Sequence, residues 1–381
     1  MTHPPVPSSR ARSYAFGETP PLRDLTTFGV GGPVAGYLQA ESVEEFIGII
    51  WDADSANAPL LVLGGGSNLL ASDVGFDGLV VRDVHADISF DKSEQDGMVV
   101  VTASAGTPWD VLVTETLGAG LSGLEALSGI PGTAGAAPVQ NVGAYGHEVS
   151  ETLRSVRAWD RAENRLVELA PEDMGLAYRT SIIKQSIGTP RPDGRGVWGP
   201  TGRWVVVDVS FELDHSPESA PVMYSELARR LETEVGGRVP AGLVRDTVLD
   251  LRRGKGMLLD DTDRDTWSAG SFFTNPILPE HAAEAVLPPD APRFPAGDAA
   301  GPGMIKASAA WLIANSGFPK GYRISDDARA SLSTKHVLAL TNRGNATAAD
   351  VEALARRVRE GVREEFGVEL HPEPVTVGID L

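Results

Sequence analysis

A glycine-rich stretch over residues 128–147 constrains the fold of this chain more than any other part of its sequence. It reads SGIPGTAGAAPVQNVGAYGH, with five glycines among mostly small residues. Glycine lacks side-chain bulk and tolerates positive φ, so such a run disfavours a core strand or helix and lets backbone N–H groups close around a ligand. A second loop, GGGSN at 64–68, follows the apolar run 59–63, which we expect to be a buried strand. Because backbone cradles of this kind bind phosphates, we interpret the two loops as one site for a diphosphate or a flat, polyanionic cofactor. A pair of glycine-rich surface turns is the alternative.

Composition excludes several classes of protein. The 381 residues predict one very large domain or two to three ordinary ones, and 42 % are hydrophobic, enough for extensive cores. The net charge of −19 argues against nucleic-acid binding. Cysteine is absent, which excludes disulfides, thiolate nucleophiles and zinc ribbons. The first twenty residues are rich in Pro and Ser without an apolar stretch, and no window approaches a membrane span. We therefore expect a flexible tail over 1–20 and a soluble, cytoplasmic protein.

Local signals predict several helices and strands. Helices are expected after a capping box at 42–45, after Thr107 with Pro108 at the first helical position and an end near Gly118, and from Thr347 to Gly367. Strands are expected over 79–82, 98–103, 156–159, 165–169 and 204–213. Their irregular alternation with helices predicts an α+β fold and not a regular doubly wound sheet. Residues 188–203 and 287–303 are expected to be loop insertions, and domain boundaries are plausible near 85 and 220.

Several common sites are missing. The chain has no GxxxxGK[ST] phosphate loop, no HExxH zinc motif and no GxSxG nucleophile elbow. Leu69 occupies the place of the third glycine of a dinucleotide fingerprint, so the cofactor cradle is not of that type. The seven histidines are scattered, and no metal site is expected.

Seven motifs in a fixed order identify a resemblance that covers about residues 22 to 376. The chain resembles the UDP-N-acetylenolpyruvoylglucosamine reductase (UDP-N-acetylmuramate dehydrogenase) family, flavoenzymes of bacterial cell-wall synthesis. The order and number of the motifs make the match specific. They are LTTF at 25–28 with Gly31 and Gly32, GGGSNLL at 64–70, the stretch 129–146, YRTS at 178–181, RRGK at 252–255, GSFFTNP at 270–276 and LHPE at 370–373.

The resemblance implies a fold and an activity. The fold is α+β, a two-subdomain FAD-binding module of the vanillyl-alcohol-oxidase type plus a third, substrate-binding domain. We expect FAD-binding subdomains over 21–85, to which 374–381 return, and over 86–220, with the substrate-binding domain over 221–373. The implied reaction is a ping-pong reduction of UDP-N-acetylenolpyruvoylglucosamine to UDP-N-acetylmuramate, with non-covalent FAD, NADPH as hydride donor and a monomeric enzyme. Tyr224 resembles the subgroup that has a mobile tyrosine loop over the substrate.

The family motifs also imply site residues. Reduction of an enol ether that carries a carboxylate develops negative charge next to that carboxylate, so it needs a cation and a proton donor there. Arg179 suits the first role because its planar fork binds carboxylates bidentately. Ser271 suits the second, and Glu373 would orient or polarise the intermediate. The substrate-binding candidates are Tyr178, Tyr224, Lys255 and Asn275. The cofactor-binding candidates are Gly64, Gly65, Gly66, Ser67, Asn68, Ile130, Gly132, Thr133, Gly135, Gly143 and Arg252.

Two departures from the family pattern and two alternatives stay open. Thr274 replaces the usual Lys, so Lys255 becomes the main candidate to bind the diphosphate. His371 replaces the usual Glu.

One alternative is an FAD-dependent oxidase of a sugar alcohol or phenol on the same scaffold. The absence of Cys, and the presence of a single His (His147) at the end of the glycine stretch, argue against its covalent flavin link. The other is a catalytically inactive nucleotide-sugar binding protein, against which Arg179, Ser271 and Glu373 argue together.

Overall fold

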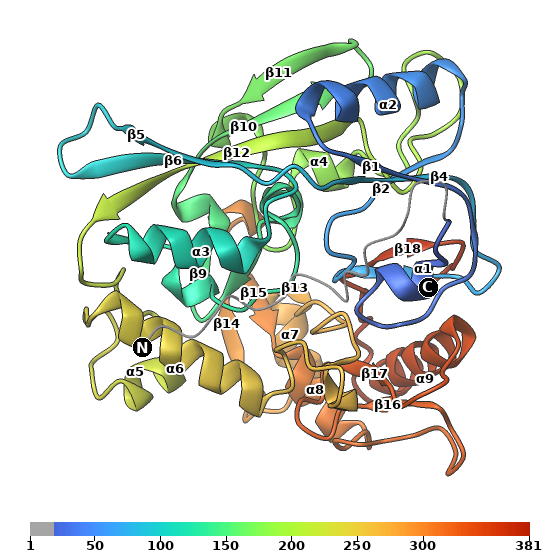
Figure 1. Cartoon of the computed structure of the whole chain (residues 1–381). Coiled ribbons are helices and arrows are strands. Elements are labelled where there is room, and N and C mark those ends of the chain that lie inside the picture. The colour runs from blue at the N-terminus through green and yellow to red at the C-terminus, as the bar shows by residue number, and fades with distance from the viewer. Residues whose placement is uncertain (1–18) are drawn as a thin grey trace. The chain divides into compact units, whose positions relative to one another are not determined.

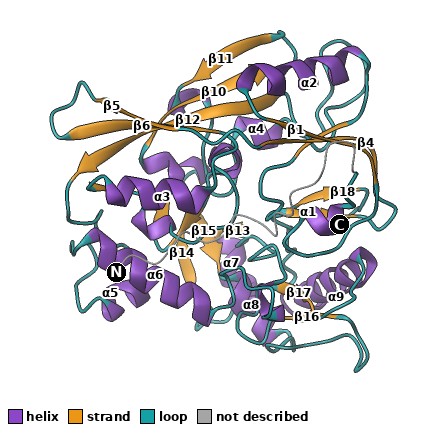
Figure 2. Cartoon of the chain, in the orientation of Figure 1, coloured by secondary structure: helices purple, strands orange, loops and turns teal. Residues whose placement is uncertain are grey.

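Strands and helices alternate without a regular repeat along the computed structural model, which describes residues 19–381 (Figure 1; Figure 2). The α+β expectation is confirmed. The described residues form two compact units. Unit 1 comprises Thr19, Ala35–Gly65 and Asp77–Gly254, and unit 2 comprises Pro20–Val34, Gly66–Phe76 and Lys255–Leu381. The tail expected over 1–20 lies almost entirely outside the described residues, and the division into three domains stays a prediction.

A small sheet and one helix form the first layer of unit 1. The sheet has the order β1 (Val34–Ala40), β4 (Phe76–Asp83), β2 (Leu60–Val62), and β2 runs parallel to β4 at its edge. Helix α2 (Val43–Ser55) buries Phe46 and Ile50 against it. Ser42 caps α2 as predicted by accepting from the Glu45 N–H, but the Glu45 carboxylate bonds the N–H of Glu41 instead of Ser42. The expected capping box is therefore only half formed.

A larger antiparallel sheet forms the second layer. Its order is β11 (Arg165–Leu169), β10 (Leu153–Asp160), β12 (Trp204–His215), β6 (Met98–Ser104), β5 (Ile88–Lys92), and β7 (Leu121–Ser122) also pairs with β12. The predicted strands are all present. Helix α3 (Trp109–Gly118) packs Trp109 edge-on against Phe211, with ring centroids 5.8 Å apart. It begins one residue later than predicted, because Pro108 is the N-cap and Thr107 donates its hydroxyl to Asp87 O.

The rest of unit 1 consists of short elements. They are the hairpin β8 (Gly143–Ala144) and β9 (His147–Glu148), the helices α4 (Ile182–Gln185), α5 (Ser225–Arg230) and α6 (Ala241–Gly254), and the 3₁₀ turns η1 (Glu125–Leu127), η2 (Ala134–Ala136), η3 (Pro138–Gln140), η4 (Val149–Glu151) and η5 (Pro171–Asp173). Helices α5 and α6 share an apolar cluster that includes Leu227 and Val248. Residues 128–147 contain the turns η2 and η3 and most of the short hairpin β8–β9, so the glycine stretch forms neither a long strand nor a continuous helix.

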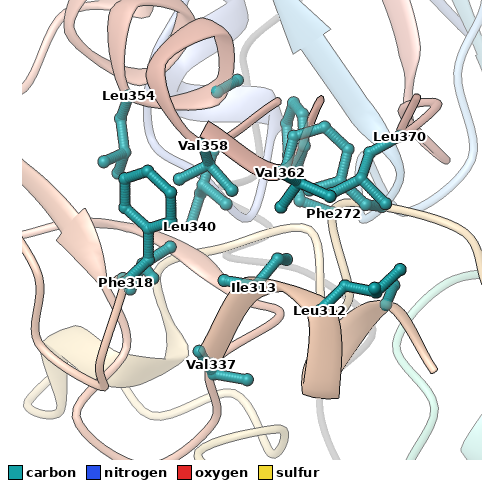
Figure 3. Packing of buried hydrophobic residues seen from close by; sticks show 14 of the residues in the cluster. Phe272, Leu312, Ile313, Phe318, Val337, Leu340, Leu354, Val358, Val362 and Leu370 are labelled. Atoms are coloured by element: carbon teal, nitrogen blue, oxygen red, sulfur yellow. The ribbon is translucent and has the colours of Figure 1, made fainter. Parts of the chain in front are cut away.

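Unit 2 is built around helices α8 (Ala309–Asn315) and α9 (Ala348–Phe366). Their apolar faces meet in one core, in which Leu312 and Ile313 lie near Val358 and Val362 (Figure 3). Its other elements are α1 (Leu22–Leu25), β3 (Leu69–Ala71), η6 (Arg264–Thr266), β13 (Ile277–Pro279), α7 (Glu280–Val286), β14 (Arg293–Pro295), η7 (Asp298–Ala300), β15 (Met304–Ala307), β16 (Ala330–Leu332), β17 (Leu340–Asn342) and β18 (Val375–Val377).

Two features of unit 2 bear on the predictions. Helix α9 begins at a complete capping box of Thr347 and Asp350 and ends at Gly367 with φ +67°, as its sequence predicted. Residues 287–303 are not only loop, because β14 pairs there with the central strand of the sheet β13-β15-β14. Strand β18 pairs in parallel with β3, so residues 375–377 lie beside residues 69–71.

Candidate functional site

The two glycine loops meet at Gly64 and Thr133, which both belong to unit 1. Strand β2 leads directly into Gly64, where an added Cβ would lie 2.8 Å from Thr133 Oγ1 of the second loop. Any side chain at Gly64 would therefore push the loops apart. Gly66 has φ +64°, and a Cβ there would lie 1.9 Å from Leu25 O, so only glycine fits. The small residues at these positions let the backbones of the two loops approach each other closely, as in a phosphate-binding cradle.

Two of the candidate glycines are explained by packing against neighbouring parts of the protein. At Gly135 a Cβ would lie 2.4 Å from Ala105 Cβ, and the Gly135 N–H donates to Ala105 O at 3.0 Å. At Gly143 a Cβ would lie 2.8 Å from both Glu148 Cγ and His147 O. The Gly135 N–H is thus already used by the protein. The assignment of Gly135 and Gly143 as cofactor contacts stays a prediction.

A buried ion pair holds the start of the second loop. Arg245 of α6 donates to both carboxylate oxygens of Asp110 in α3, at 2.7 and 2.8 Å, and both side chains are almost fully buried. Asp110 also accepts the Gly129 N–H at 2.6 Å, while Arg252 donates to Gly129 O at 3.1 Å. Burial lowers the pKa of Arg252 because the charged form loses its hydration. Helix α3 therefore holds the N–H of Gly129 through Asp110, and helix α6 holds its carbonyl through Arg252.

Arg179 occupies a turn position that side chains disfavour. Ala177 and Thr180 exchange backbone hydrogen bonds of 3.2 and 3.1 Å, so Tyr178 and Arg179 form the tip of a tight turn. Arg179 has φ +57°, and turns with positive φ at this position usually contain Gly or Asn. Such strain persists where the surroundings impose it, and it often marks functional residues.

The guanidinium of Arg179 is fixed to the second glycine loop. It donates to Gly143 O at 2.7 Å and to Asn141 O at 3.5 Å, and its Cζ lies 5.4 Å from the centroid of the Tyr178 ring. Asn141, itself left-handed with φ +48°, bonds Glu148 Oε2 and the Ser150 N–H. A cation is therefore held beside the predicted cofactor loop by two backbone carbonyls.

The segment that carries Tyr224 lies against the end of the same loop. The Tyr145 and Tyr224 rings meet edge-on, with centroids 5.6 Å apart. His147 Nε2 lies 2.8 Å from Pro221 O, and its Nδ1 lies 2.7 Å from Glu151 Oε2. Burial acts to lower the pKa of His147, but the hydrogen bond and the charge of Glu151 outweigh it and raise the pKa above its usual value. A protonated imidazole can donate to both partners at once.

Ser271 and Glu373 lie on paired extended segments of unit 2. Phe273 and Pro372 form an antiparallel bridge, and the Glu373 N–H donates to Phe272 O at 2.8 Å. Asn68 reaches the same segment, because its Nδ2 donates to Glu373 O at 3.4 Å and its carbonyl accepts the Val375 N–H. The structure thus brings together three predicted residues that are far apart in the sequence.

The remaining substrate-binding candidates, Asn275 and Lys255, belong to unit 2 as well. Asn275 Oδ1 accepts the Ala309 N–H at 2.9 Å, so the side chain ties residue 275 to the start of α8. Lys255 is half-buried. The two departures from the family pattern adjoin each other, since the Thr274 N–H donates to His371 O at 3.0 Å and the side chain of His371 is exposed.

One residue of this site was not predicted. His336 Nε2 lies 3.3 Å from Ser271 Oγ. The His336 segment is itself anchored, because Asp265 accepts from the N–H and hydroxyl of Thr334 and from Arg343. Burial would raise the pKa of Asp265, but these hydrogen bonds and the arginine charge lower it below its usual value. The sequence around His336 carries no local signal for this contact.

The predicted catalytic and substrate-binding residues are distributed over both units. Arg179, Tyr178 and Tyr224 belong to unit 1, and Ser271, Glu373, Lys255 and Asn275 belong to unit 2. Among residues 19–381, no three His, Asp or Glu side chains are grouped as a metal site would require. No helix in this range is both long enough and apolar enough to cross a bilayer.

Comparison with known families gives two matches. Residues 34–170 match the FAD binding domain, and residues 261–377 match the C-terminal domain of UDP-N-acetylenolpyruvoylglucosamine reductase. The FAD-binding match includes both glycine loops and ends just after strand β11. The second match includes Ser271, Asn275 and Glu373. An FAD-binding fold is therefore confirmed for unit 1.

Individual relatives match over nearly their whole length. The UDP-N-acetylenolpyruvoylglucosamine reductase of Saccharopolyspora erythraea is 52 % identical over 369 residues, which cover 94 % of this chain and 95 % of the relative. That of Thermobifida fusca is 48 % identical over 377 residues, covering 96 % and 99 %. The crystal structure of UDP-N-acetylenolpyruvylglucosamine reductase from Thermus caldophilus superposes with a TM-score of 0.60 at 29 % identity, covering 94 % of this chain and 98 % of the other.

Proposed function

The chain belongs to the UDP-N-acetylenolpyruvoylglucosamine reductase family, and from that membership we propose that it reduces UDP-N-acetylenolpyruvoylglucosamine to UDP-N-acetylmuramate with electrons from NADPH. This reaction supplies a precursor of peptidoglycan. The observation that carries the proposal is Arg179, a cation held in a strained turn against the carbonyl of Gly143. A planar guanidinium is suited to bind the carboxylate that the enolpyruvyl substrate carries.

FAD is the cofactor, and the two glycine loops are the proposed site of its diphosphate. Gly64, Gly65 and Gly66 would cradle it from one side, and Gly132 and Thr133 from the other. Arg252 and the Asp110–Arg245 pair keep the second loop in place through Gly129. Bound FAD would supply the two-electron transfer between NADPH and the methylene carbon of the enol ether.

Arg179 is the proposed stabiliser of the charge that develops during reduction. Addition of a hydride equivalent to the methylene carbon leaves an electron pair on the neighbouring carbon, from where it spreads into the carboxylate. A planar guanidinium beside that carboxylate lowers the energy of this charge most when it is already in position. The contacts to Gly143 O and Asn141 O supply that positioning.

Ser271 is the proposed proton donor. Its hydroxyl would protonate the carbon that bears the carboxylate, which completes the saturated product, and His336 at 3.3 Å offers a partner through which the hydroxyl can be reprotonated. The proton balances the negative charge brought by the hydride equivalent. Glu373 lies on the segment paired with that of Ser271, because its N–H donates to Phe272 O. We propose that it orients the intermediate.

The sugar nucleotide is proposed to contact Tyr178, Tyr224, Lys255 and Asn275. Lys255 is the candidate for its diphosphate, since Thr274 supplies a hydroxyl where the family usually has a lysine. We further propose a monomeric cytoplasmic enzyme that contacts neither nucleic acid nor membrane, with FAD-binding subdomains over 21–85 and 86–220 and a substrate-binding domain over 221–373.

The test is substrate-dependent oxidation of NADPH by the purified holoenzyme. Addition of UDP-N-acetylenolpyruvoylglucosamine should accelerate loss of NADPH absorbance, and mass spectrometry should show a product two hydrogens heavier than the substrate. Sugar alcohols and phenols with oxygen as acceptor serve as the comparison. Turnover of those substrates without any effect of the enolpyruvyl compound would overturn the proposal in favour of an oxidase. FAD and sugar-nucleotide binding without turnover would favour the inactive binding protein.

A further inference from the structure

Residues 189–203, which we call the brace, cover the exposed edge of the strand that enters the first glycine loop. Strand β2 is an edge strand, paired only with β4. The Leu63 N–H bonds Val81 O on the β4 side, so the N–H of the preceding residue, Val62, points to the other side. There it donates to the hydroxyl of Thr201 at 2.7 Å, and Thr201 is only 8 % exposed.

Thr201 is in turn held by a buried arginine. Arg161 follows β10 and donates to Thr201 O and Gly202 O, both at 2.9 Å. The same guanidinium makes a bidentate ion pair with Asp54 at the end of α2, at 2.7 and 2.9 Å. Its side chain is 3 % exposed and that of Asp54 is 7 % exposed. One cation therefore joins the brace, β10 and α2.

An aromatic ring completes the attachment of the brace. Trp198 is almost fully buried. The guanidinium carbons of Arg161 and Arg191 lie 4.6 and 4.4 Å from the centroid of its ring, respectively. Arg191 also reaches Asp54 Oδ1 at 3.3 Å. Cation–π contacts are strongest where water is excluded, as around Trp198. These contacts fix the brace within unit 1, so Thr201 is presented to Val62 at a defined place.

The brace acts two residues before the cofactor loop. Val62 is followed by Leu63 and then by Gly64, whose backbone lies against Thr133 of the second loop. A shift of the β2 edge would carry Gly64 with it, and glycines resist such a shift little because they are flexible. Without the Thr201 hydroxyl, the partly buried Val62 N–H would lose its acceptor.

We propose that Thr201 is a positioning residue for FAD, which holds the end of β2 so that the loop 64–66 has its binding conformation before the cofactor arrives. The proposal rests on FAD binding by this loop and does not depend on which substrate is reduced. Preorganisation of this kind raises affinity because less ordering remains to be done on binding. It gives residues 189–203 a function that their loop composition did not reveal.

The test compares three variants of the full-length holoenzyme. Thr201→Val removes the hydroxyl at constant shape, and Thr201→Ser retains it. Thr189→Val is the matched control, because Thr189 lies in the same brace and its hydroxyl donates to Ser186 O at 2.7 Å, away from β2. FAD affinity is measured by serial dilution of each holoenzyme, with the fluorescence of released flavin as the signal, and turnover is measured at saturating FAD.

Thr201→Val should raise the Kd for FAD about tenfold, as expected for the loss of one partly buried hydrogen bond. Thr201→Ser and Thr189→Val should stay within about twofold of the wild type, and turnover at saturating FAD should be retained by all three. An unchanged Kd in Thr201→Val would overturn the proposal. So would an equal rise in Thr189→Val, because the effect would then reflect general loosening of the brace. A wrong substrate assignment would change the turnover measurement only and leave the Kd comparison decisive.

Discussion

Ser271 Oγ lies 3.3 Å from His336 Nε2, although 65 residues separate the two along the chain. Neighbouring backbone bonds hold both residues, since the Phe272 N–H donates to Leu338 O at 2.8 Å and the His336 N–H donates to Ser333 Oγ at 3.2 Å. A serine hydroxyl is a weak acid and needs a route by which its proton is replaced. An imidazole nitrogen at hydrogen-bond distance provides one.

Ser271→Ala should slow one half-reaction and spare the other. Reduction of bound flavin by NADPH needs no acid near the enolpyruvyl carbon, so its rate should stay within a few-fold of the wild type. Reoxidation by the enolpyruvyl substrate should fall by ~10²–10⁴, the usual effect of losing a positioned proton donor. Stopped-flow absorbance separates the two steps, and Ser325→Ala, at an exposed serine bonded to Asp327, is the control. Equal slowing of both steps would contradict the assignment.

The Ser271 and His336 side chains should also be coupled. If His336 acts through the Ser271 hydroxyl, the double variant Ser271→Ala/His336→Asn should reoxidise no more slowly than Ser271→Ala alone, because residues that act as a unit are not additive. The same stopped-flow assay measures this. Additive slowing would mean that His336 acts on its own.

Lys255→Ala should weaken binding of the sugar nucleotide more than it slows chemistry. A charge-assisted hydrogen bond to a diphosphate is worth about 1.5–3 kcal/mol, so the Kd should rise about ten- to a hundredfold. Calorimetric titration with UDP-N-acetylmuramate measures this directly. Lys320→Ala, at an exposed lysine of the same unit, should leave the Kd unchanged. If the two variants bind equally well, Lys255 does not contact the diphosphate.

Asp110→Asn should destabilise the protein strongly. It leaves the Arg245 charge buried without its carboxylate and weakens the anchor of Gly129, and loss of one partner of a buried ion pair costs about 3–5 kcal/mol. Asp250→Asn breaks an exposed pair with Arg253 and should cost less than about 1 kcal/mol. Urea unfolding of the two variants gives the comparison. Similar free energies of unfolding would show that burial of the Asp110–Arg245 pair contributes little.

Stability should depend on pH through His147. Its pKa is raised in the folded protein, so the folded state binds the proton more tightly than the unfolded state does. The stabilisation is therefore fully present below the unfolded pKa, about 6.5, and is lost as pH rises through the higher folded pKa. The difference in unfolding free energy between wild type and His147→Gln should shrink over that range. Glu151→Gln should remove most of the pH dependence, and a difference that grows with pH would contradict the assignment.

Local sequence signals predicted the elements whose ends are determined by neighbouring residues. Helix α9 has a capping box at Thr347 and a left-handed Gly367, and both act within one turn of the helix. The start of α3 was wrong by one residue because the Thr107 hydroxyl is bonded to Asp87, twenty residues away. A contact between residues so far apart in the sequence cannot be predicted from a local sequence pattern.

The candidate site shows the same limit. The glycine loops were recognised because φ and steric space restrict the residue type at Gly64 and Gly66. The family motifs supplied Ser271 and Glu373. His336 and Thr201 were missed because an ordinary His and an ordinary Thr acquire their roles only through partners at Ser271 and Val62, more than sixty residues away.

The parallel pairing of β18 with β3 has a consequence for the order in which the chain folds. Unit 2 is assembled from three separate segments, and residues 69–71 find their partner strand only at residues 375–377. During synthesis, residues 77–254 emerge from the ribosome before residues 375–377 are made, when β3 has no partner strand. Most of unit 1 can therefore fold first. Closing so long a loop is slow, which leaves residues 66–76 exposed to chaperones and proteases until translation is nearly finished.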